Sequence, residues 1–118
     1  ACAATGGVVG INGIGSFLGA NDNRSETFAR HVDHVAQLVG AQHVALGLDY
    51  VFDSQEMDDY LAKMAHTFPP ELGYTKDMRM VTPEQLPEIV ETLLGWGYAE
   101  ADLQLVLGGN LLRLAARD

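Results

Sequence analysis

The sequence predicts an α/β fold with about two parallel strands and four to five helices. Two apolar runs of strand length, residues 8–12 and 43–49, lack the alternation of polar side chains that a half-exposed strand has, which is typical of a parallel sheet covered on both faces. One helical pattern separates the two runs, so they are expected to form a right-handed crossover unit. A (β/α)₈ barrel takes about 250 residues. We therefore predict that residues 1–118 are a single region and one piece of such a barrel.

The first strand, residues 8–12, is followed by a loop rich in glycine and asparagine, residues 13–23. Ser25 is predicted to cap the helix that comes next, and Gly40 is well placed to end it. The apolar face of this helix repeats at helical spacing. Its members are Phe28, His31, Val32, Val35, Leu38 and Val39.

The second strand is predicted over residues 43–49, and an amphipathic helix over residues 54–66. Residues 69–81 contain prolines and a glycine, so we expect an irregular and exposed stretch. The apolar side of the helix consists of Met57, Tyr60, Leu61 and Met64.

A further helix is predicted to begin at Thr82. Thr82 is a capping residue, Pro83 suits the first turn, and Gln85 completes a capping box. Pro87 either restarts this helix or lies in its first turn. The helix is expected to end by residue 97, at one of two glycines.

Two more helices are predicted at the end of the chain. The first covers residues 99–107 and stops at the glycine pair 108–109. Asn110 is expected to cap the last helix, residues 111–117.

The composition excludes several classes of function. The formal net charge of −9 leaves no basic patch for nucleic acid or for an anionic membrane surface. No apolar run approaches the about 20 residues of a transmembrane helix, and no signal peptide is recognised. The single Cys2 cannot form an intramolecular disulfide, and nothing nearby supports it as a nucleophile.

Asp49 is the main candidate for chemistry. It ends the second apolar run, and (β/α) enzymes keep their catalytic groups at the carboxyl ends of such strands. Alternatively, Asp49 caps the helix that follows or binds a loop amide. Asn12 ends the first strand in the same way and is expected to line a substrate pocket.

Other patterns have simpler interpretations. His31 and His34 form an H-x-x-H pair that can bind metal on a helix face, but no third ligand is in view. We interpret this helix as packing on the sheet, with His34 hydrogen-bonded near the core. The glycines at 10, 13 and 15 do not have the spacing of a phosphate-binding loop, and they are expected to allow sharp turns. The acidic run 53–59 lacks the glycine and spacing of a calcium loop.

The chain resembles the carboxyl-terminal portion of the renal (membrane) dipeptidase family, especially its bacterial members. The similarity rests on an ordered set of motifs: Gly6-Gly-Val-Val-Gly-Ile-Asn12, His31-Val-Asp-His34, Val39-Gly-Ala-Gln-His-Val-Ala-Leu-Gly-Leu-Asp49, Pro83-Glu-Gln-Leu-Pro87 and Gly108-Gly-Asn-Leu-Leu-Arg113. Each motif alone is weak, and the ordered set is specific.

This resemblance implies an amidohydrolase-like (β/α)₈ barrel that hydrolyses dipeptides with two zinc ions bridged by a carboxylate and a water. Residues 8–12 would be the seventh strand and residues 43–49 the eighth. The zinc ligands lie on earlier strands of the family's barrel, so no residue of this chain is expected to bind metal. Asp49 matches the family's acid that accepts a hydrogen bond from the bridging water and handles its proton.

The sequence departs from the family at two places. Many members continue the last strand with Phe-Asp-Gly, whereas this chain has Tyr50-Val51-Phe52-Asp53. Members often carry an aromatic residue or a tyrosine in the loop after the seventh strand; Phe17 is the nearest candidate here, lacks a hydroxyl, and is assigned no role. The local substrate pocket is therefore expected to differ.

The resemblance thus predicts a zinc metallopeptidase, with dipeptides as substrates and this chain supplying the last strands and the acid/base Asp49. The isolated chain is expected to be inactive, and it should form a homo-oligomer or associate with the missing part of the barrel. The alternative is a catalytically inactive, truncated fragment that self-associates as a structural oligomer. A cytoplasmic location is expected by similarity to bacterial members.

Overall fold

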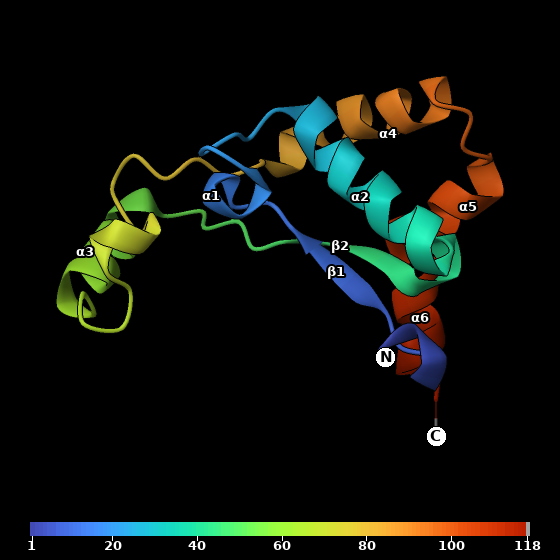
Figure 1. The fold of residues 1–118 in the computed structure, drawn as a ribbon, viewed down its shortest axis with the longest axis horizontal. Helices are drawn as coiled ribbons and strands as arrows, with labels where there is room; N and C mark the ends of the chain where they lie inside the picture. Colours follow the sequence, from blue (N-terminus) through green and yellow to red (C-terminus); the bar gives the residue numbers. More distant parts are fainter. Residues whose placement is uncertain (118) are drawn as a thin grey trace.

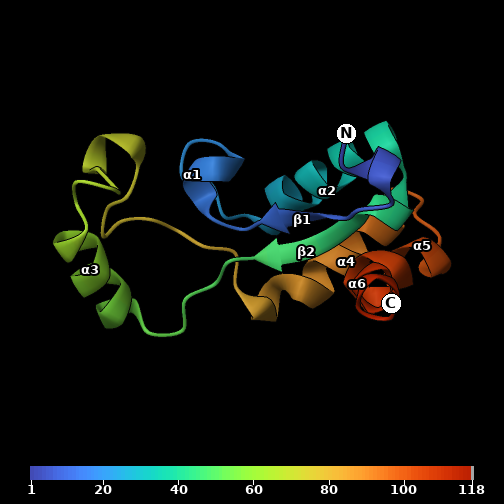
Figure 2. The same ribbon diagram turned by 90° about the horizontal axis from the view of Figure 1, so that it is seen from below.

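The computed structural model describes residues 1–117 and has the predicted α/β architecture. Strands β1 (Val9–Asn12) and β2 (Val44–Leu48) pair in parallel, with Val9 opposite Val44. The crossover between them is made by helix α2 (Ser25–Val39), which lies along the strands in Figures 1 and 2. Both apolar runs are therefore strands, each slightly shorter than predicted.

The core lies between the strands, α2 and helix α4 (Leu86–Gly95). Phe28 and Val32 of α2 are fully buried, as expected from the apolar pattern. Leu38, by contrast, is 69% exposed, so the predicted apolar face was wrong at the end of the helix. The buried stripe instead includes two alanines, whose small side chains allow close packing; its members are Ser25, Phe28, Ala29, Val32 and Ala36.

The capping box at Thr82 is confirmed, and it has a second function. The Thr82 N–H donates to Oε1 of Gln85 at 2.9 Å, while Nε2 of Gln85 donates to Oγ of Ser25 at 3.0 Å. Ser25 is thus the first residue of α2 and not its cap, which corrects the prediction. The same amide donates to the Asn23 carbonyl at 2.9 Å, so Gln85 joins the starts of α2 and α4. Pro87 lies in the first turn of α4.

The end of the chain differs from the prediction. Helix α5 (Glu100–Gln104) continues through a π-helical turn (Leu105–Gly109) into α6 (Asn110–Ala115), and the path bends at Gly108. Asn110 is not a helix cap. It is fully buried, and its Nδ2 donates to the carbonyls of Ala41 and Val44 at 2.8 and 2.7 Å. These two hydrogen bonds connect α6 to the start of β2.

Helix α3 (Ser54–Lys63) and the segment after it lie apart from the sheet, at the far end from α5 and α6 (Figures 1 and 2). The radius of gyration, 15.5 Å, therefore exceeds the roughly 13.5 Å of a compact chain of this length. Helix α3 is shorter than predicted.

Two stretches predicted as irregular contain short elements. Residues 13–23 include α1 (Gly15–Leu18), and residues 69–81 include a 3₁₀ turn (Pro70–Leu72). The second stretch is not exposed throughout, because Val81 is fully buried and Met80 forms an antiparallel bridge with Ile14.

Candidate functional site at the carboxyl ends of the strands

Asn12 and Asp49, the two predicted site residues, meet at the carboxyl edge of the sheet. The Asn12 Nδ2 donates to Oδ2 of Asp49 at 3.2 Å. On its other side, Oδ1 of Asn12 accepts a hydrogen bond from the Ile14 N–H at 2.7 Å. Because the Ile14 N–H can only donate, it fixes which end of the Asn12 amide faces the carboxylate.

The backbone at this edge is unusual. Leu48 and Asp49 have φ values of 47° and 62°, in the left-handed region. That region costs a non-glycine residue roughly 1–2 kcal/mol, and such strain is concentrated at functional sites. The sheet register also slips between Ile11 and Asn12. Asp49, which directly follows β2, lies beside Asn12 at the point where these distortions occur.

Gly13 allows this close approach. Its N–H donates to the Leu48 carbonyl at 2.7 Å, and a Cβ at position 13 would lie 2.9 Å from the same oxygen. Gly13 is therefore required by this close approach, and not by the sharp turn that was predicted, since its φ is not positive.

Asp49 does not cap the following helix, so that alternative is wrong. Asp53 does so instead, since its Oδ1 accepts from the N–H groups of Gln55 and Glu56 at 3.0 and 3.1 Å. Asp49 is exposed, and among residues 1–117 its side chain accepts a hydrogen bond only from Asn12. The carboxylate is thus accessible for proton transfer.

A hollow of about 290 Å³ opens beside Asp49; we call it the apolar hollow. Its walls come from the residues that follow each strand, from α1, from α3 and from the segment after α3. The lining residues are Ile14, Phe17, Asp49, Val51, Met57, Tyr60, Leu61, Phe68, Tyr74 and Met78.

Aromatic contacts connect these walls. Tyr74 meets Phe17 edge-on with ring centroids 6.3 Å apart, and it meets Phe68 at 5.1 Å. Phe17, the nearest candidate for the family's aromatic residue or tyrosine in this loop, lines the hollow. No role was predicted for Phe68 and Tyr74, because an irregular stretch has no periodicity that would indicate a shared face.

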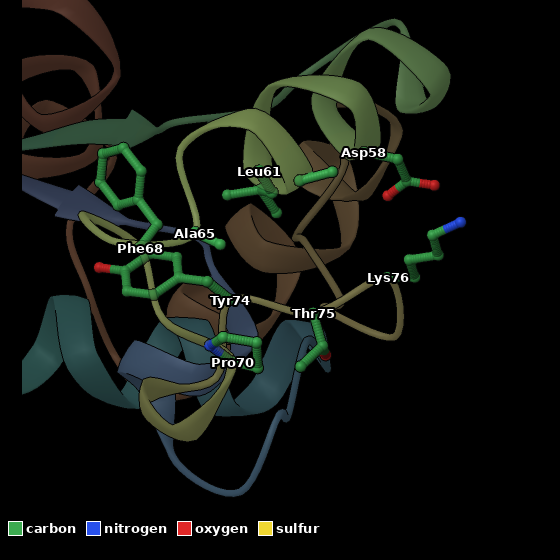
Figure 3. Close-up of a pocket in the computed structure, with 9 residues that line it drawn as sticks. Asp58, Leu61, Ala65, Phe68, Pro70, Tyr74, Thr75 and Lys76 are labelled. Carbon is green, nitrogen blue, oxygen red and sulfur yellow. The ribbon is translucent and has the colours of Figure 1, made fainter.

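A second hollow of about 270 Å³ lies on the other side of a wall formed by Leu61, Phe68 and Tyr74. Figure 3 shows Asp58 and Lys76 at one end of it and the two aromatic rings at the other. It does not include Asp49.

The H-x-x-H pair is not a metal site in this structure. The His31 Nε2 is 2.9 Å from the Leu18 carbonyl, while His34 is exposed. The expected hydrogen bond near the core is therefore made by His31, and the assignment to His34 was wrong. Within residues 1–117 no three His, Cys, Asp or Glu side chains gather to hold a metal ion. The described residues do not form a zinc site of their own.

The fold and this site define an α/β protein with its polar pair at the carboxyl edge of a parallel sheet. Residues 1–65, which include Asn12 and Asp49, match the family model of membrane dipeptidases, peptidase family M19. The chain is also similar to an uncharacterised protein in the pqqA 5′ region of Klebsiella pneumoniae, with 34% identity over 115 residues. The chain belongs to the membrane dipeptidase family, and so to a family of hydrolases.

The alignment covers 93% of this chain but 35% of the Klebsiella relative, so the chain spans about a third of that protein's length. No solved structure matches the chain significantly. In the part of the chain that the structure describes, no helix has the length and apolar character needed to cross a bilayer.

Proposed function

We propose that these residues are the carboxyl-terminal part of a zinc-dependent dipeptidase and supply its acid/base carboxylate, Asp49. The observation that carries this proposal is the Asn12–Asp49 pair at the carboxyl edge of the sheet, inside the family match. General acid/base catalysis needs a carboxylate that can reach the reacting proton. The exposure of Asp49 meets that requirement.

The hydrogen bond from Asn12 supports this role. It holds Oδ2 of Asp49 in place, while Oδ1 accepts no hydrogen bond from residues 1–117. One oxygen is thereby positioned and the other is available to take up and return a proton. The family's zinc ions, when bound, would lower the pKa of the water to be activated.

A (β/α)₈ barrel is proposed as the complete fold. The described residues contain only two strands, and the outer edge of each has no partner strand. Backbone groups at such edges favour pairing with further strands. The length of the Klebsiella relative, of which the chain spans 35%, leaves room for the other strands.

The test compares the 118-residue chain with the protein in its full natural length. We expect the 118-residue chain to bind no stoichiometric zinc and to hydrolyse no dipeptide, and the full-length protein to do both. Zinc at one or two ions per 118-residue chain would contradict the placement of the ligands on earlier strands. A zinc-loaded full-length protein without dipeptidase activity would contradict the proposed function.

Self-association without catalysis is the second candidate. It is favoured by the unpaired strand edges and by the leucines that α6 exposes, including Leu112 at 72% and Leu111 at 49%. Light scattering of the 118-residue chain should give a dimer or larger species, and a monodisperse monomer at high concentration would contradict this. The cytoplasmic location stays a prediction, which cell fractionation would test.

A further inference from the structure

We propose that the apolar hollow beside Asp49 binds a bulky, uncharged apolar side chain of the dipeptide substrate. This inference rests on the proposed function, which makes a dipeptide the substrate, while the apolar character of the hollow follows from its lining residues. Its volume of about 290 Å³ is close to the smallest volumes of small-molecule binding pockets. Roughly ten water molecules occupy the same volume in liquid water. That space suits one side chain.

The lining of the hollow is apolar and in part uncovered. Ile14 and Leu61 form a buried base, with 5% and 8% exposure. Phe17 and Tyr60 are each 50% exposed, although they line the same hollow. Covering such aromatic faces with an apolar group removes them from water, which favours binding.

The charge of the lining argues against other substrates. Among the described residues of the hollow there is no lysine, arginine or histidine, and Asp49 is the only acid. An acidic side chain would lack a counter-charge and would face Asp49. A lysine side chain would bring its ammonium group among apolar walls, which costs hydration.

Part of the wall lies outside the residues that match the family model. Phe68, Tyr74 and Met78 form part of its wall and lie beyond residue 65, where the family match ends. Val51, another wall residue, lies in the turn that departs from the family's Phe-Asp-Gly. The selectivity therefore depends on residues that the family match does not include.

The chain's four methionines offer a direct test. Met57 and Met78 line the hollow, whereas Met64 and Met80 do not. We would label the methionine methyl groups with ¹³C in the zinc-free full-length protein, assign the signals of Met57, Met64, Met78 and Met80 by substitution, and titrate the protein with Leu-Gly, Phe-Gly, Gly-Gly, Asp-Gly and Lys-Gly. The experiment needs neither metal nor turnover, so its failure is distinguishable from failure of the proposed function.

The Met57 and Met78 signals should shift saturably with Leu-Gly and Phe-Gly, at concentrations about tenfold lower than with the other three peptides. The Met64 and Met80 signals should stay in place. Absence of any shift, equal shifts of all four signals, or equal binding of Gly-Gly, Asp-Gly or Lys-Gly would overturn the proposal.

A pair of variants provides a second measurement. Phe17→Ala removes a half-exposed wall of the hollow and should weaken Leu-Gly binding about five- to tenfold. Phe52→Ala removes the same side chain from an 85% exposed position outside the hollow and should change nothing. Equal effects of the two variants would contradict the assignment.

Discussion

Asn110 offers a sharp test of how the C-terminal helix is attached. Its buried Nδ2 makes two hydrogen bonds to backbone carbonyls at the start of β2, those of Ala41 and Val44. Asn110→Ala removes both donors and leaves a small void. The Ala41 carbonyl still accepts from the Val44 N–H, so the main loss is at the Val44 carbonyl.

The cost can be estimated from these contacts. Each of the two hydrogen bonds makes a net contribution of roughly 0.5–1.5 kcal/mol to the free energy of unfolding, and a buried acceptor left without its donor costs about 1–3 kcal/mol. We expect Asn110→Ala to lower the free energy of unfolding by about 2 kcal/mol. That is a large fraction of the roughly 5–15 kcal/mol by which folded domains are stable.

Urea unfolding followed by circular dichroism measures this change. With a slope of about 1–3 kcal/mol per molar urea, the midpoint should fall by roughly 1 M. Asn110→Asp keeps the oxygen that accepts from Arg113 Nη1 at 3.0 Å and replaces only the donor to the two carbonyls, so it should also lower the midpoint. A midpoint within about 0.2 M of wild type for either variant would refute this account of the attachment.

Three further predictions follow from single contacts. Asn12→Asp places a second carboxylate about 3.2 Å from that of Asp49, so it should destabilise the fold by about 1 kcal/mol at low salt and less in about 1 M salt, where repulsion between exposed charges is screened; equal urea midpoint shifts at both salt concentrations would contradict this. Burial and the hydrogen bond to a carboxylate raise the pKa of Tyr98 to about 12. This pKa lies above that of an unfolded tyrosine, which is near 10. The protonated Tyr98 hydroxyl therefore stabilises the folded state below pH 10, and this contribution is lost as the pH rises through about 12. The wild-type minus Tyr98→Phe difference in phenolate absorbance should therefore titrate near 12, and a difference curve centred at 10 would be inconsistent with it. Gly13→Ala forces a Cβ against a carbonyl oxygen at 2.9 Å and should cost about 1–3 kcal/mol, whereas Gly95→Ala enters open space in a helix and should be neutral or stabilising by about 0.5–1 kcal/mol; the reverse order in thermal unfolding would contradict the geometry.

The sequence predicted those features that depend on local patterns. The two strands follow from unbroken apolar runs, because both faces of a parallel sheet are covered. The capping box at Thr82 follows from residues three positions apart. Asn12 and Asp49 were placed at one edge because parallel strands end on the same side.

Features that depend on distant partners were missed. Ser25 and Asn110 both suit a helix cap, but each finds a hydrogen-bond partner far away in the sequence, 60 residues for Ser25 and 66 and 69 for Asn110. The tertiary contact determines their role, and no local rule identifies it. The walls of the apolar hollow were missed for the same reason, since Phe68 and Tyr74 lie in a segment without periodicity.

The most direct test of the central claim is the rate of dipeptide hydrolysis by Asp49→Asn in the full-length protein. The matched control is Asp53→Asn, four residues away, where asparagine can still cap α3. If Asp49 moves the proton, Asp49→Asn should lower kcat about 10²–10⁴-fold with an unchanged unfolding temperature, and Asp53→Asn should stay within about threefold of wild type. A fully folded Asp49→Asn enzyme with wild-type kcat would contradict the account.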